Sequence, residues 1–213
     1  MEEISADDAL QRVCGYRPLN GFHVKGRFNI TSIGDPMEDV VFPISISNCL
    51  VDEYYSPIVW YKASVEWTDC TFKKIEIDAV YFLKGLVCRD SEFLSPISWS
   101  AGGHNSTNTP ILLERVKFHK FVDFFDCWFR GPVILRNVEF ISGTNLLNYD
   151  HGWVNFEVPP VLENVRGVVD VNRNLVNRNG VLVLTERSPR YIYPQEKAER
   201  PRSGPTESQP NDA

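Results

Sequence analysis

The chain has 213 residues, 43% of them hydrophobic and 23% charged, an ordinary globular composition that excludes a wholly disordered chain, a collagen and a coiled coil. Its 22 basic and 28 acidic side chains give a formal net charge of −6, and no basic block is longer than two residues, which disfavours direct nucleic-acid binding and binding to anionic membranes. No signal peptide and no membrane-spanning apolar run is visible, and the cysteine count of five is odd, so we predict free thiols in a cytoplasmic protein.

The first residues predict a short helix over residues 5–13. Ser5 is a favourable N-cap residue, and two aspartates in the first turn suit the positive end of the helix dipole. Leu10 and Val13 lie on one face, so the helix needs a surface to cover. Gly15 is placed to end the helix in a left-handed conformation.

A four-residue motif then recurs: Asn or Asp, Cys or Val, any residue, and Phe. Full copies are Asp69–Phe72, Asp126–Phe129 and Asn137–Phe140, and weaker copies begin at residues 48, 90, 115 and 164. Apart from Phe129, which lies halfway between two others, the fourth positions follow one another at steps of 21, 21, 25, 22 and 27 residues. A nearly constant step of this size is typical of a β-solenoid, in which equivalent strands stack in parallel.

Alternation of side chains along each strand predicts the inward face. Residues two apart point the same way, so we expect Cys70 and Phe72 inside and Thr71 outside. A ladder of apolar pairs with the same period predicts a further inward face, made of Val65 and Trp67, Ile75 and Ile77, Ile97 and Trp99, Ile111 and Leu113, and Val133 and Leu135.

We therefore predict an all-β fold, a right-handed parallel β-helix of about five irregular coils of 21–27 residues with a short N-terminal helix. The expected domains are a capping helix over 1–16, a solenoid over 17–187 that ends with a strand at 180–185, and a disordered, proline-rich tail over 188–213. An antiparallel β-sandwich is the alternative fold, because it also has short strands at regular spacing.

The stretch Asp126–Phe140, which reads Asp-Cys-Trp-Phe-Arg-Gly-Pro-Val-Ile-Leu-Arg-Asn-Val-Glu-Phe, resembles divergent pentapeptide-repeat proteins. The resemblance covers residues 48–167 and implies a right-handed parallel β-helix with small residues and Phe or Leu stacked inward. The coils are longer than those of true pentapeptide repeats, and only fragments keep the five-residue spacing, so a more irregular β-helix is equally compatible.

Two loops are candidate binding sites. The loop 100–110 is a polar insertion with a flexible Gly-Gly pair, and its candidate binding residues are His104 and Asn105. The loop 143–160 combines aromatic and polar groups, and its candidate binding residues are Tyr149, Asp150, His151 and Trp153. The alternatives are an ordinary surface loop for the first, and aromatic side chains that cover the solenoid flank for the second.

The spacing of cysteine and histidine does not indicate a metal or a catalytic site. Cys49, Cys70 and Cys127 share one motif position, which favours core packing, and Cys14 and Cys88 lie outside the pattern. Neither a C-x-x-C nor an H-E-x-x-H pair occurs, so we predict no metal, no cofactor and no catalytic residue.

We expect a non-enzymatic protein-interaction module, such as a scaffold, an inhibitor or an immunity-type protein, that binds a partner protein with its faces and side loops. One alternative is a polysaccharide-acting β-helix enzyme, with Asp123 and Asp126 as candidate carboxylates. The other is an acidic inhibitor that mimics nucleic acid, as the resemblance to pentapeptide-repeat proteins implies, although interleaved basic residues argue against it. The partner and the oligomeric state stay open.

Overall fold

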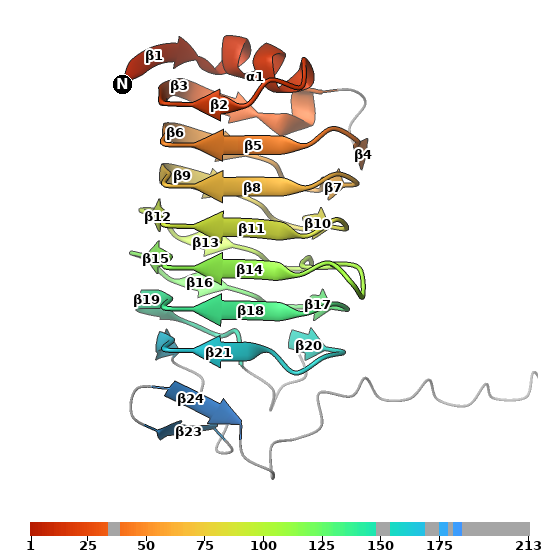
Figure 1. Cartoon of the computed structure of the whole chain (residues 1–213), viewed down its shortest axis with the longest axis vertical. Coiled ribbons are helices and arrows are strands. Elements are labelled where there is room, and N and C mark those ends of the chain that lie inside the picture. The colour runs from red at the N-terminus through yellow and green to blue at the C-terminus, as the bar shows by residue number, and fades with distance from the viewer. Residues whose placement is uncertain (34–38, 148–153, 169–174, 179–180, 185–213) are drawn as a thin grey trace, which may run out of the picture.

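The computed structural model describes residues 1–33, 39–147, 154–168, 175–178 and 181–184. Parallel strands stack into a column of about six turns (Figure 1), which confirms the β-solenoid and excludes the sandwich. In Figure 1 the front strands run to the left as the chain descends and the next strands return behind them, so the column is right-handed, as parallel crossovers nearly always are.

The front of the column is a seven-stranded parallel sheet. Its inward residues are apolar and buried, and it includes one strand, at residues 19–20, in a coil before the first motif copy at residue 48, so the stack is longer than the motif count predicted. The strands are, in spatial order, β2 (Leu19–Asn20), β5 (Ile44–Ser47), β8 (Val65–Thr68), β11 (Leu86–Arg89), β14 (Ile111–Glu114), β18 (Val133–Arg136) and β21 (Val161–Glu163).

The back and the right-hand side complete each coil. The back is a ten-stranded sheet made of β1 (Glu2–Ser5), β3 (Phe22–Asn29), β6 (Leu50–Tyr55), β9 (Thr71–Glu76), β12 (Glu92–Phe93), β13 (Ile97–Ser98), β15 (Lys117–Phe118), β16 (Val122–Asp123), β19 (Glu139–Thr144) and β22 (Arg166–Val168). The right-hand side holds β4 (Asp39–Val40), β7 (Trp60–Tyr61) and β10 (Tyr81–Phe82) in one sheet, and β17 (Cys127–Phe129) and β20 (Val154–Phe156) in another.

The recurring motif marks one corner of each coil. Its first residue has a left-handed backbone in all six coils, with φ between 50° and 53° at residues 48, 69, 90, 115, 137 and 164. Asn and Asp tolerate this conformation better than most residues, which explains their recurrence. The second residue then points inward, and the fourth joins a stack of rings formed by Phe72, Phe93, Phe118 and Phe140, whose neighbouring centroids lie 4.9 to 5.0 Å apart.

Two parts of the predicted ladders belong to other sides of the column. Asp126 begins a second kind of corner, and Cys127 and Phe129 lie on β17, so Cys127 does not share the place of Cys49 and Cys70. The pairs Ile75–Ile77 and Ile97–Trp99 lie on the back, whereas Val65–Trp67 lies on the front. Short local patterns cannot distinguish the sides, because every strand alternates in the same way.

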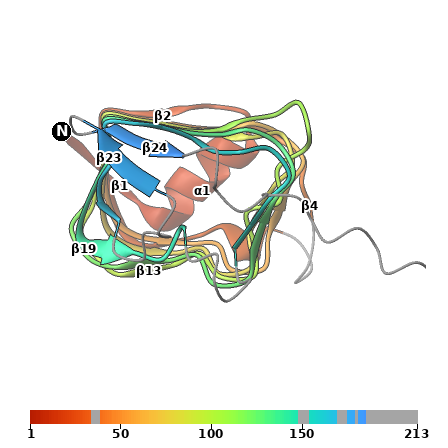
Figure 2. The ribbon, with the colours of Figure 1, turned by 90° about the horizontal axis from the view of Figure 1, so that it is seen from below.

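The helix α1 (Ala6–Cys14) lies across the N-terminal end of the column (Figure 2). The Ser5 hydroxyl accepts a hydrogen bond from the Asp8 N–H at 3.1 Å, which confirms the N-cap, and Ala9 and Val13 are buried. The expected left-handed Gly15 is wrong: its φ is −81° because its N–H still bonds to the helix, and Tyr16 makes the turn at φ 57°.

A 3₁₀ turn and a C-terminal hairpin lie outside these sheets. A 3₁₀ turn, η1 (Ile30–Ser32), follows β3. The predicted last strand is β24 (Val181–Leu184), which pairs antiparallel with β23 (Leu175–Arg178) in a hairpin next to β21. The proline-rich tail of 188–213 lies outside the described residues.

Candidate binding surfaces

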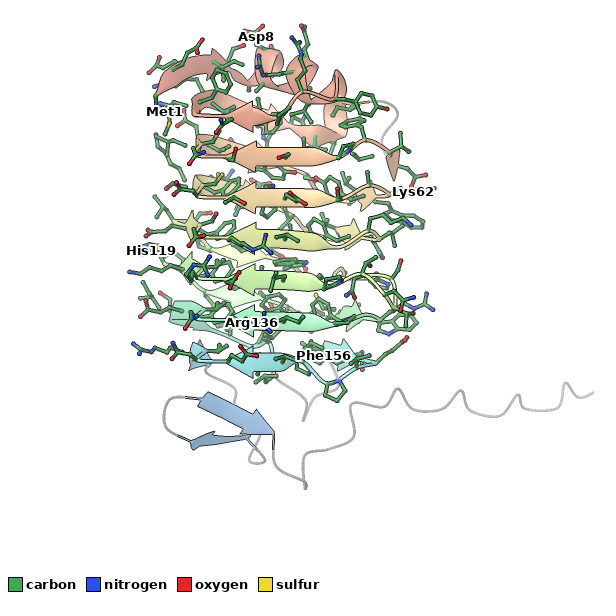
Figure 3. All side chains as sticks on the ribbon, viewed as in Figure 1. Met1, Asp8, Lys62, His119, Arg136 and Phe156 are labelled. Carbon is green, nitrogen blue, oxygen red and sulfur yellow. The ribbon has the colours of Figure 1, made fainter. Side chains whose placement is uncertain are left out.

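Opposite charges alternate on successive coils over much of the back and at the end of the front strands. Asp52 contacts Lys73 at 2.7 Å and His23 at 2.9 Å, and Arg115 contacts Asp90 at 2.6 Å. Figure 3 shows His119 and Arg136 at the outside of the column, where they contact Glu92 and Glu163, each at 2.8 Å. The pairs with lysine and arginine neutralise acids that a nucleic-acid mimic would have to present. As exposed pairs they stabilise the fold only slightly.

The loop 100–110 packs against its neighbours, and its Gly-Gly pair allows a close approach to the rest of the column. A side chain at Gly102 would bring its Cβ within 2.5 Å of the Val80 carbonyl oxygen. Asn105 is buried; its amide donates to the carbonyls of Thr109 and Pro132 at 2.8 and 3.1 Å, and its oxygen accepts the Gly131 N–H at 2.9 Å. The structure therefore gives Asn105 a supporting role within the loop.

His104, by contrast, belongs to a column of rings along the right-hand corner. Ring centroids are 5.1 Å apart between Trp60 and Tyr81, 4.4 Å between Tyr81 and His104, and 5.3 Å between His104 and Trp128. Burial, and then the charge of Arg130, lower the pKa of His104, which favours neutral imidazole. We call Trp60, Tyr81, His104 and Trp128 the aromatic column.

Sequence reasoning found one member of the aromatic column and missed three. The four residues follow one another at steps of 21, 23 and 24 positions, close to the motif step. A search for aromatic residues at that period, outside the motif, would have found them.

The upper end of the aromatic column is unusually apolar for a surface. Trp60 is 49% exposed, Ile58 is 55% exposed and Val41 is 63% exposed. Ile58 has φ 56°, and the equivalent corner positions hold Ala79, Ala101 and Asp126. A β-branched residue is strained in this left-handed conformation, so the chain keeps an exposed isoleucine here at some loss of stability.

The other predicted site lies largely outside the described residues. Tyr149, Asp150, His151 and Trp153 all fall in 148–153. The residues just before them, Leu146 and Leu147, are buried.

The buried cysteines and Asp123 have structural surroundings. Four of the five free cysteines are buried, and burial raises the pKa of Cys70 to about 12, so its thiol stays protonated. Asp123, a candidate carboxylate of the alternative enzyme, accepts the Asn145 amide at 2.6 Å and the Phe125 N–H at 2.9 Å. Across the described ranges, no group of three or more possible ligands could hold a metal ion.

Comparisons with models of protein families, with curated proteins and with solved structures found no match. The described residues include no helix that is long and apolar enough to cross a membrane.

Proposed function

We propose that the chain is a non-enzymatic protein-interaction module whose partner binds the corner around Trp60. The observation that carries this proposal is the group of exposed apolar side chains Val41, Ile58 and Trp60. Surfaces of this kind often mark binding sites, and large aromatic side chains contribute most to protein interfaces.

Three features suit this corner to binding. The Trp60 ring packs on Tyr81 at 5.1 Å, so it is already oriented and loses little conformational entropy when a partner covers it. The strain at Ile58 is the second feature, because strained residues cluster at functional sites. An ion pair between Lys62 and Asp39 beside the rings supplies a polar rim, as in the usual anatomy of an interface.

We also propose distant kinship with the pentapeptide-repeat proteins and a cytoplasmic location. The left-handed corner residue, followed by a small inward residue and a stacked Phe, supports the kinship. The five free cysteines agree with a reducing compartment.

The test is affinity capture from the native host with three forms of the full chain. Trp60→Ala removes the exposed ring, and Ile141→Ala is the matched control, because Ile141 is 51% exposed on the back of the column. We expect one protein to be enriched with wild type and with Ile141→Ala and to be lost with Trp60→Ala, while the midpoints of thermal unfolding agree within about 2 °C. A partner that Trp60→Ala retains in full would contradict the assignment of the corner.

A further inference from the structure

Two kinds of coil meet at the back of the column. In β9 the strand runs without interruption from the stacked Phe72 to the next inward residue, Ile75, three positions later. In the following coil four positions separate Phe93 from Ile97, and the extra residue divides the strand into β12 and β13. The strand β13 pairs with β16 alone and forms one end of its sheet, so it shares no ladder with β9.

This mismatch opens a groove of about 560 Å³ between β9 and β13. Backbone hydrogen bonds close it at both ends, from the Leu94 N–H to Phe72 at 2.9 Å and from the Ala79 N–H to Ser100 at 2.8 Å. Inside, the Ser95 hydroxyl accepts the Ile75 N–H at 3.2 Å in place of a strand partner. The lining is partly apolar and includes Tyr55, Pro57 and Pro96, whereas Ile75 and Ile77, which also line the groove, are only 2% and 1% exposed.

The charges of the groove are unbalanced at Asp78. Glu76 is neutralised, because it contacts the Lys74 ammonium and, at 3.8 Å, the Arg27 guanidinium. Asp78 has only hydroxyl partners: Ser98 donates to its Oδ1 at 2.8 Å and Ser100 donates to the same oxygen. Among the residues that the structure describes, none forms an ion pair with Asp78, and neither hydroxyl occupies its Oδ2.

We infer that this groove binds an extended peptide segment that inserts a lysine or arginine side chain. The cation would contact the open oxygen of Asp78, and the methylene groups of its stem would pack against Pro57 and Pro96. The inference rests on the proposed function only in taking the ligand to be part of a protein. The groove adjoins the proposed corner at Ile58, but its lining includes none of Val41, Ile58 and Trp60.

The experiment titrates the full, ¹⁵N-labelled chain with capped peptides that are identical except for a central arginine, citrulline or glutamate. Citrulline keeps the shape of arginine without its charge. We expect the arginine peptide to shift the amide signals of Ile77 and Ser98 in a saturable way, and to bind about tenfold more tightly than the citrulline peptide. The glutamate peptide should leave these signals unchanged. These three titrations use the unaltered protein.

Two variants then locate the charge. Asp78→Asn should remove the preference for arginine over citrulline, and Glu66→Gln should keep it, because Glu66 is exposed on the front sheet. Equal affinity for arginine and citrulline, absence of binding, or shifts confined to another face would each overturn the inference. Trp60→Ala should leave these titrations unchanged, so a failure here is distinguishable from a failure of the proposed corner.

Discussion

Truncation of Phe118 to alanine tests the stacking that defines the column. Phe118 is 1% exposed, and its ring lies between those of Phe93 and Phe140, with centroids 4.9 Å away on each side and interplanar angles of 14° and 4°. The variant therefore removes two ring contacts and leaves a cavity in the middle of the stack.

The structure gives the expected magnitude. A buried Phe→Ala change costs about 3–5 kcal/mol, and each aromatic pair contributes about 0.5–1.5 kcal/mol beyond burial of area. Phe118→Ala should therefore lie at the upper end, about 4–5 kcal/mol. Phe140, whose described ring contact is with Phe118 alone, should lie near the lower end, about 3–4 kcal/mol. Phe118→Leu keeps most of the apolar volume and should cost about 1–1.5 kcal/mol.

Urea unfolding followed by circular dichroism and by tryptophan fluorescence measures these differences, and coincident transitions license a two-state treatment. If Phe118→Ala does not fold, a double-mutant cycle with Phe93→Leu and Phe118→Leu still measures coupling, which should be clearly non-zero. Thr71→Ala is the control, because Thr71 lies on the outward side of β9 and is only half-buried. A cost for Phe118→Ala no larger than that for Thr71→Ala would refute the stacked core.

Three further outcomes follow from single residues. Ile58→Asn should raise the free energy of unfolding by about 1 kcal/mol, because asparagine tolerates the left-handed backbone better, and a lower midpoint in urea would contradict the strain at that corner. Asn105→Ala should lower the free energy of unfolding by about 2–4 kcal/mol, because it leaves the Gly131 N–H without its partner. The control in the same loop is Asn108→Ala, which should change it by less than about 0.5 kcal/mol, because Asn108 is exposed. Equal effects of the two variants would show that the Asn105 amide does not stabilise the loop. Because the pKa of His104 is lowered in the folded state, the unfolded chain binds a proton at His104 more readily than the folded chain does. The contribution of His104 to folding stability is therefore complete above pH 6.5 and declines as the pH falls below it. An NMR titration of the folded chain that gives a His104 pKa above 6.5 would contradict this pH dependence.

The sequence pattern was sufficient to predict the stack of coils, because each coil repeats the same physical requirements. A corner needs a residue that tolerates a left-handed backbone, and the column needs a Phe above each Phe, so Asp69 and Phe72 recur one coil later as Asp90 and Phe93. The side to which a strand belongs was not predictable from such patterns. Cys127 and Ile75 show this, because alternation within one strand contains no information on the direction of the coil.

The candidate sites were harder to predict than the fold. His104 was found through its polar loop, although its surroundings come from Tyr81 and Trp128 on the neighbouring coils. The groove beside Asp78 depends on one extra residue between Phe93 and Ile97 and on contacts between two coils. The identities of the groove residues alone predict neither the extra residue nor the contacts between the two coils.

The parallel register has a consequence for how the protein is made. Each parallel strand finds its partner one coil away, from 20 residues for Glu2 and Phe22 to 27 for Leu135 and Leu162. Such separations are about a tenth of the chain, as in fast-folding proteins with mainly local contacts, although parallel sheets are commonly slow to form. During synthesis, α1 and the first coil emerge from the ribosome before the rest. Every later coil can then add to a template that already exists, so nascent edges are covered in the order in which they are translated.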